Sequence, residues 1–203
     1  ITLYLREDRR HIQDTDVVEI KSAIKTKMNL EMAATDEMIQ IASRISPRDC
    51  CLVPEKREEL TTEGGLDVAS QLARMKDVCA RLADSNIRVS LFIDPDRKQI
   101  DAAISCGAPV IEIHTGHFAD AVTPFERDLK FNEIKKACKY AHNLGLQVNA
   151  GHGLTLENTF AIAKINSIVE LNIGHSIISR AVFVGLANAT SEMKALMLEA
   201  RGL

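Results

Sequence analysis

Two short segments of this sequence repeat the pattern Asn-x-Gly-His, at Asn149–His152 and at Asn172–His175. An apolar, β-prone run comes before each copy, Leu146–Val148 before the first and Val169–Leu171 before the second. Glycine permits a tight turn, so each histidine is expected just past the end of a strand. Side chains at the carboxyl ends of parallel strands converge, and ligands bind there. An enzyme is therefore the first hypothesis.

Protonable side chains also end the other predicted strands. Glu31 is the clearest, because the run 28–32 is otherwise apolar and a buried carboxylate is unfavourable unless it is paired or protonated. We interpret Glu31 as functional, with a structural ion pair as the alternative. Glu112 and His114 share one face of their strand, although His114 also fits a hydrogen-bonded spacer. Carboxylates and imidazoles together can move protons in both directions. The strand-end residues are Arg6, Glu7, Glu31, Glu55, Asp94, Glu112, His114, His152 and His175.

Three segments are candidates for binding phosphate. Gly174-His175-Ser176 opens what we expect to be the last helix, where unpaired amides suit an anion; a plain turn capped by Ser176 is the alternative. Thr61-Thr62-Glu63-Gly64-Gly65 is a weaker candidate cradle. The charged run Arg6–His11 follows a strand end, so it could grip a phosphate, or it could be a solvated surface. No metal site is expected, because His114-x-x-His117 lacks a third ligand nearby.

The spacing of apolar residues predicts strands separated by helices, which indicates an α/β fold with a parallel sheet. Helical spacing covers stretches such as Leu72/Met75/Val78/Leu82. Thr123-Pro124-Phe125-Glu126 is a capping box that should start another helix, with Gly145 closing it. The strand-like runs are 1–5, 28–32, 50–53, 88–93, 110–113, 147–150 and 169–173.

Seven such units in one domain, residues 1–203, favour a (β/α)8 barrel, the TIM barrel, that lacks one unit. Complete barrels run to about 250 residues. The polar residues at nearly every strand end support the barrel, whereas a doubly wound sheet, the alternative, would gather ligand groups at one switch point. Since the chain starts in mid-strand and without Met, we expect the first βα unit to be missing.

The composition and net charge of the chain argue against several classes of protein. The net charge of −3 over 203 residues gives no basic field for nucleic acid or an anionic membrane surface. No apolar run approaches about 20 residues, so no membrane span is expected, and no signal peptide is evident. Five cysteines without a CxxC spacing suggest reduced core thiols and a cytoplasmic protein.

Seven motifs, in order and over nearly the whole chain, closely resemble the pyridoxine 5′-phosphate synthase family of vitamin B6 biosynthesis. They are Leu5–His11, Asn29–Ala33, Cys51–Arg57, Thr61–Asp67, Ile111–Gly116, Val148–Leu154 and Leu171–His175.

The resemblance implies a (β/α)8 barrel with extra helices that assembles as a homo-octamer. It implies a transferase that needs no cofactor and condenses 1-deoxy-D-xylulose 5-phosphate with 3-amino-2-oxopropyl phosphate, giving pyridoxine 5′-phosphate, phosphate and water. By matching position, Glu31 resembles a general base, His152 a general acid and Glu112 a transition-state stabiliser. Contacts to the deoxyxylulose phosphate would come from Arg6, His11 and Thr61, and contacts to the aminoketone phosphate from Gly153, Gly174 and His175.

The chain departs from the family pattern in two places. The family's first strand, with its Asn-x-Asp-His segment, is absent, and Tyr4 stands where the family has a catalytic His. A phenol with a pKa of about 10 is a poor base at neutral pH, but it can donate a hydrogen bond. One alternative is therefore a catalytically impaired, phosphate-binding member of the family. Another is a different barrel enzyme acting on phosphosugars; a Schiff-base aldolase among these would need a strand Lys, and none is evident.

Overall fold

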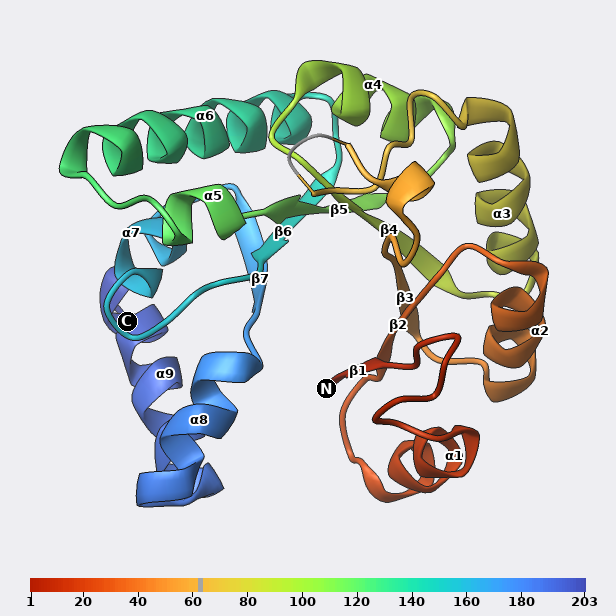
Figure 1. Cartoon of the computed structure of the whole chain (residues 1–203), viewed down its shortest axis with the longest axis horizontal. Coiled ribbons are helices and arrows are strands. Elements are labelled where there is room, and N and C mark those ends of the chain that lie inside the picture. The colour runs from red at the N-terminus through yellow and green to blue at the C-terminus, as the bar shows by residue number, and fades with distance from the viewer. Residues whose placement is uncertain (62–63) are drawn as a thin grey trace. The chain divides into compact units, whose positions relative to one another are not determined.

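The computed structural model describes residues 1–61 and 64–203. Seven parallel strands lie in this part of the chain, and they follow one another in the sheet in sequence order (Figure 1). This is the strand order of an α/β fold of the (β/α)8-barrel type, and all seven predicted strands are confirmed. Their bounds are β1 Thr2–Tyr4, β2 Asn29–Met32, β3 Asp49–Leu52, β4 Arg88–Ile93, β5 Val110–His114, β6 Gln147–Gly151 and β7 Ile168–Asn172.

The chain groups into two compact units, Ile1–Glu112 and Ile113–Leu203, and β5 runs from one into the other. In the first unit, apolar and polar side chains alternate along the strands. Leu30 and Leu52 are fully buried on one face of the sheet, and Glu31 and Cys51 point to the opposite face. The helices of this unit are α1 Asp14–Ala23, α2 Asp36–Ile45, the short 3-10 helix η1 Arg57–Glu59, α3 Leu72–Asp84 and α4 Arg97–Ser105.

Helix α3 shows how the apolar pattern dictates packing. Met75, Val78, Cys79 and Leu82 recur at spacings of three and four residues, and all are buried. This stripe faces α2, α4 and β4, with which α3 is in contact (Figure 1). The alternation of a period of two in the strands with a period near 3.6 in the helices is what made this unit predictable.

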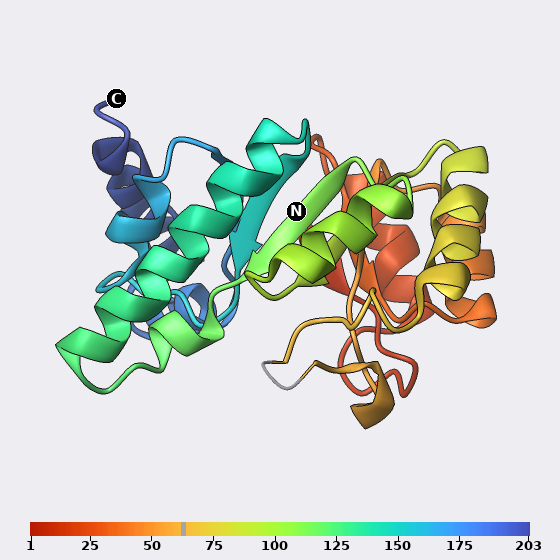
Figure 2. The same cartoon turned by 90° about the horizontal axis from the view of Figure 1, so that it is seen from above.

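The second unit holds α5 Gly116–Ala119, α6 Pro124–Asn143, α7 Thr159–Ala163, α8 His175–Val184 and α9 Leu186–Ala200. Helix α6 lies along β6 (Figure 2). It begins as predicted: the Thr123 hydroxyl accepts from the Glu126 N–H at 3.2 Å, and the Glu126 carboxylate accepts from the Thr123 N–H at 3.1 Å. Gly145, with φ of +88°, follows its carboxyl end.

One expectation about the carboxyl-terminal region was wrong, and the alternative given for Ser176 is not found. Helix α8 is not the last helix, because Gly185, at φ of +81°, separates it from α9. Ser176 is not the cap of α8 either. The helix begins at His175 with Gly174 as its N-cap, and the Ser176 hydroxyl donates to the Leu154 carbonyl at 2.6 Å.

The prediction of core thiols is confirmed, since all five cysteines are buried and none forms a disulfide. No helix within residues 1–61 and 64–203 is both long and apolar enough to cross a membrane.

Candidate active site

The polar face of the sheet in the first unit carries two layers of side chains. The register of the strands determines which residues form each layer, because paired residues on neighbouring parallel strands point to the same face. In the first layer, Arg88 donates to Asp49 at 2.6 Å, and the Lys27 ammonium lies 3.6 Å from the same carboxylate. This layer is held by ion pairs and is structural.

The second layer lies nearer the carboxyl ends of the strands. Tyr4 pairs with Glu31, Glu31 with Cys51, and Cys51 with Ser90. A phenol, a carboxyl, a thiol and a hydroxyl therefore stand side by side across four strands. We call Tyr4, Glu31, Cys51, Glu55 and Glu112 the carboxylate cluster.

Glu31 is the residue in this cluster best suited to proton transfer. Burial raises its pKa from 4.5 to about 7. A carboxyl group with such a pKa is divided between its acid and base forms near neutral pH, which suits a general base. Burial is the only cause of this shift, so the environment favours the functional interpretation of Glu31 over the structural ion pair.

Glu112 is buried, 3% exposed, and its Oε2 atom lies 3.8 Å from the Cys51 sulfur, which donates to it. Glu112 is more deeply buried than His114, which is only half-buried. The carboxylate is therefore held by a partner on β3, 61 positions away in the chain.

Tyr4, at the end of β1, is half-buried and shares a hydrogen bond with Glu55. Burial, followed by the Glu55 carboxylate, raises the pKa of Tyr4 above its ordinary value, so the phenol stays protonated. Both oxygens of Glu55 also accept from the Glu7 N–H, at 3.2 Å each. The Arg6 guanidinium lies 5.6 Å from the centre of the Tyr4 ring.

The charged run after β1 contains one residue that stabilises the loop and others that could contact a substrate. Arg9 is tied down: it donates to Asp14 at 2.8 Å and to Glu37 at 2.6 Å. Arg6 pairs with Asp8 at 3.0 Å, and His11 is exposed. Arg6 and His11 thus lie at the carboxyl end of β1 and remain candidates for phosphate contacts, whereas Arg9 braces the loop against α1 and α2.

Asp94 accepts hydrogen bonds from both ends of the candidate phosphate-binding segment 61–65. The Thr61 hydroxyl and the Gly65 N–H, the latter at 3.1 Å, both donate to Asp94. A Cβ atom at Gly65 would come within 2.6 Å of the Asp94 backbone nitrogen, so glycine is needed there. Thr62 and Glu63, which belong to the same predicted cradle, lie outside the described residues.

In the second unit, His114, His117 and His152 form an imidazole cluster. The ring centres of His114 and His152 are 4.9 Å apart, and those of His114 and His117 are 5.8 Å apart. Partial burial and then the neighbouring His114 lower the pKa of His152, which favours its neutral form. His152 also has φ of +82°, an uncommon backbone conformation for a residue with a side chain.

Two neighbours hold this conformation in place. The buried Thr115 hydroxyl lies 2.7 Å from the Gly151 carbonyl and 2.6 Å from that of His152. A Cβ atom at Gly116 would lie 2.5 Å from the His114 Nε2 atom and 3.2 Å from the His152 Cδ2 atom. The two imidazoles therefore pack against a position where only glycine fits.

The predicted phosphate contacts of this unit follow β6 and β7. Gly153 has φ of +74°, and a Cβ atom there would come within 2.7 Å of Ala119. Gly174 caps the amino-terminal end of α8, and His175 is the first residue of that ten-residue helix. Gly174 and His175 are exposed, and the free amides of the first helical turn face this end.

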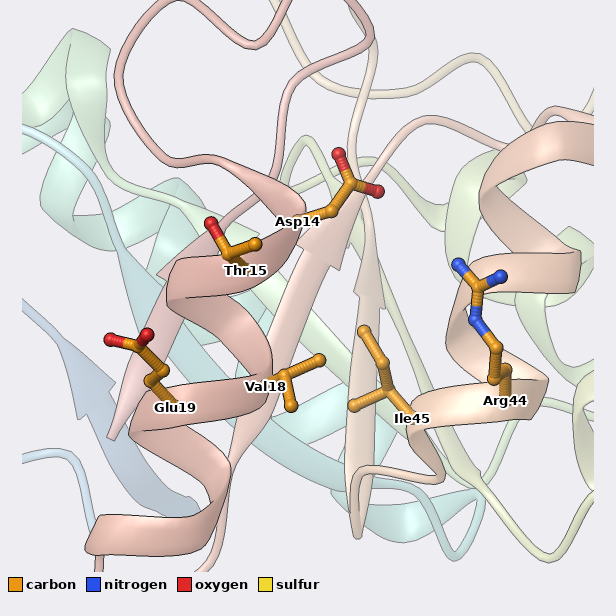
Figure 3. A pocket seen from close by; sticks show the side chains of 6 residues that line it. All are labelled: Asp14, Thr15, Val18, Glu19, Arg44 and Ile45. Atoms are coloured by element: carbon orange, nitrogen blue, oxygen red, sulfur yellow. The ribbon is translucent and has the colours of Figure 1, made fainter.

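A separate surface pocket of about 300 Å³ lies between α1 and α2 (Figure 3). Its lining includes Val18 and Ile45, and none of the predicted site residues. Within residues 1–61 and 64–203, no three His, Cys, Asp or Glu side chains gather into a group that could hold a metal ion.

Sequence reasoning did not assign a role to Cys51, Thr115 or Gly116. A signal existed for Cys51, because a period of two places it, and not Cys50, on the face of Glu31. For Gly116 the signal was its place directly after the strand that carries His114.

The fold is that of α/β-barrel enzymes, and the groups described above are of types that can transfer protons. Residues 1–199 match the family model described as "Pyridoxal phosphate biosynthesis protein PdxJ". A pyridoxine 5′-phosphate synthase of Coxiella burnetii is 62% identical over 201 residues, covering 99% of this chain and 84% of the relative. The synthase of Photobacterium profundum is 59% identical, covering 99% and 83%. The chain therefore belongs to the pyridoxine 5′-phosphate synthase family, as its motifs predicted.

Solved structures support the fold alone. KGPDC from Streptococcus mutans superposes with a TM-score of 0.66 at 15% identity, covering 98% of this chain and 85% of that one. A structure of the Amycolatopsis orientalis BexX/CysO complex gives 0.61 at 10% identity, covering 100% and 82%.

Proposed function

We propose that this chain condenses 1-deoxy-D-xylulose 5-phosphate with 3-amino-2-oxopropyl phosphate to form pyridoxine 5′-phosphate, phosphate and water. Membership of the synthase family supports the reaction class. The observation that carries the proposal for this chain is Glu31, whose raised pKa of about 7 suits repeated proton transfer. Joining an amine to a ketone, eliminating phosphate and closing an aromatic ring all require such transfers.

In this proposal Glu31 is the general base and Glu112 stabilises positive charge that develops on the substrate. Different environments support different roles for the two carboxyl groups. Burial favours the neutral form of Glu31, whereas Glu112 accepts a hydrogen bond from the Cys51 thiol. An acid–base residue on β2 and an electrostatic residue on β5 are thereby provided by one unit.

His152 is the proposed general acid. Its lowered pKa means that the resting imidazole is neutral, so it must take a proton in one step before giving it to a leaving group in another. In a reaction that includes both kinds of step, His152 can be protonated in one step and deprotonated in another.

Tyr4 is proposed as a hydrogen-bond donor to a substrate oxygen. Its raised pKa rules against a role as a base and keeps the phenol protonated, with the Glu55 carboxylate beside it as a hydrogen-bond acceptor. The catalytic pair at this position is then Tyr4 with Glu55, in place of the single His of the family pattern.

Substrate phosphates are proposed to bind at two sets of residues, one in each unit. Arg6, His11 and Thr61 would contact the deoxyxylulose phosphate, with Arg6 supplying charge-assisted hydrogen bonds. Gly153, Gly174 and His175 would contact the aminoketone phosphate, using the amides at the start of α8.

We further propose a cytoplasmic homo-octamer. Five reduced thiols suit a reducing compartment. Exposed apolar side chains on α8 and α9 support self-association, since Ile178, Val182, Phe183 and Leu186 are 57% to 84% exposed. Light scattering on the purified chain tests the assembly: a mass near eight chains is expected, and a monomer at micromolar concentration would contradict it.

The proposed reaction is tested by supplying both phosphorylated substrates to the purified chain. Pyridoxine 5′-phosphate and inorganic phosphate are followed together, with each substrate omitted in turn as a control. Product that requires both substrates is expected. Tight binding of either phosphate compound to a folded chain without product would instead favour the impaired, phosphate-binding alternative.

A further inference from the structure

The Cys51 side chain lies between the two carboxyl groups to which the proposed function gives different tasks. It is fully buried and in register with Glu31 on one side. On the other side its sulfur lies 3.8 Å from the Glu112 Oε2 atom. Ser90, 5% exposed, is its register partner on β4.

We propose that Cys51 is a positioning residue, which holds the Glu112 carboxylate by a hydrogen bond and keeps it apart from Glu31 so that each group can ionise separately. This proposal rests on the proposed function. Without the thiol, two carboxyl groups would share one polar layer, and ionisation of one would oppose ionisation of the other.

The surroundings favour a thiol over a reactive thiolate. Burial, then Glu112, then Glu31 raise the pKa of Cys51 well above its ordinary value, so the side chain keeps its proton and can donate it. A role as a hydrogen-bond donor is therefore favoured over a role as a nucleophile. A thiol is also small and weakly polar, so it fills the buried layer whether Glu31 is protonated or not.

The neighbouring Cys50 provides a matched control. It lies on the same strand, is equally buried, and points to the opposite, apolar face among residues such as Leu30 and Leu52. Replacing either cysteine removes the same volume from the same strand, but only Cys51 contacts Glu112.

The test compares Cys51→Ala, Cys51→Val and Cys51→Ser with Cys50→Ala. Val fills the space without a donor, and Ser keeps a donor, so the set separates packing from hydrogen bonding. We expect Ala and Val at position 51 to lower kcat about tenfold with little change in KM. We expect the acidic limb of the pH profile of kcat to move up by about half a unit or more, because an unsupported carboxylate is protonated more easily. Cys51→Ser should stay within about threefold of the wild type, and Cys50→Ala should leave the pH profile unchanged.

A double-mutant cycle with Glu112→Gln shows whether Cys51 acts through Glu112. The effect of Cys51→Ala should disappear in the Glu112→Gln background. The ionisation of Glu112 can also be followed directly, by NMR titration of the protein labelled with ¹³C-glutamate. The Glu112 signal is assigned as the one missing from Glu112→Gln. This measurement does not depend on turnover, so it can be made even if the enzyme is slow.

Two results would overturn the proposal: a Cys51→Ala pH profile that matches Cys50→Ala, or an effect of Cys51→Ala that persists in full beside Glu112→Gln. A wild-type chain that makes no product would instead count against the proposed function, so the two failures are distinguishable. If Cys51→Ala does not fold, Cys51→Val and Cys51→Ser carry the comparison.

Discussion

The Tyr4 phenol and the Glu55 carboxylate share a hydrogen bond, although 51 positions separate them in the chain. Glu55 is oriented in turn by the Glu7 N–H, which donates to both of its oxygens. A neutral donor and an acceptor are thus coupled at the carboxyl end of β1. We propose that this pair lets a chain with Tyr at this position present a protonated hydrogen-bond donor to the substrate.

Replacing Tyr4 tests that pair. Tyr4→Phe keeps the ring and the contact with Arg6 but removes the hydroxyl, so kcat should fall about tenfold or more. Tyr4→His should retain turnover, and its pH profile should gain an ionisation near the ordinary imidazole pKa of about 6.5. Steady-state kinetics from pH 5.5 to 9 measure both effects. Wild-type kinetics in Tyr4→Phe would show that the hydroxyl has no part in the reaction.

Glu31 should reduce stability at alkaline pH. Its pKa is raised from 4.5 in the unfolded chain to about 7 in the folded one. Below pH 4.5 the group is protonated in both states, and as pH rises through 7 the folded state loses stability relative to the unfolded state. Glu31→Gln carries no charge, so its unfolding free energy should exceed that of the wild type above pH 7, by up to about 3 kcal/mol.

Urea unfolding at pH 5.5 and at pH 8.5 gives this difference, which should grow with pH. The control is Glu19→Gln at an exposed position of α1, whose stability difference should stay small at both values. A Glu31→Gln difference that is constant with pH would mean that the carboxyl is not buried as described.

Gly116→Ala should disturb the imidazole cluster. The new methyl group would lie 2.5 Å from His114 Nε2 and 3.2 Å from His152 Cδ2, so both rings must move. We expect kcat to fall at least about tenfold, with a loss of about 1–3 kcal/mol in stability from overpacking. Gly145→Ala is the control: its φ of +88° makes Ala unfavourable, but no atom lies within 4 Å of the added Cβ. That variant should lose stability and keep its turnover.

Arg6 and Arg9 lie only three positions apart, but their replacement should affect different properties of the protein. Arg9→Gln breaks ion pairs to Asp14 and Glu37, so the unfolding free energy should fall by about 1 kcal/mol while the KM values change little. Arg6→Gln should raise KM for the deoxyxylulose phosphate and leave stability nearly unchanged, because its partner Asp8 is exposed. Denaturation and initial-rate kinetics on the two variants separate the roles, and an exchange of these phenotypes would refute the assignment.

Much of the fold follows from local pattern. The alternation around Glu31, the apolar stripe of α3 and the capping box at Thr123 each depend on residues close together in sequence, so they were predictable. The end of the chain was harder. Helix formers dominate α9, whereas α8 is rich in Ile, Val and Phe, and Gly185 marks the break between the two helices.

Site contacts that link distant strands could not be predicted in the same way. Cys51 reaches Glu112 across 61 positions, and Asp94 closes the loop at Thr61 across 33. Such contacts depend on strand register, which a single sequence indicates only through the period-two pattern. The structure supplied the register, and with it the layer that places Tyr4, Glu31 and Cys51 side by side.

The central claim is that this chain makes pyridoxine 5′-phosphate with Glu31 as its base. The most direct measurement is product formation from both phosphorylated substrates by the wild type and by Glu31→Gln, with folding of each checked by circular dichroism. We expect steady turnover by the wild type, with inorganic phosphate released in step with product, and a loss of at least about 100-fold in Glu31→Gln. A folded wild type that forms no product, or a Glu31→Gln variant that works as fast as the wild type, would contradict it.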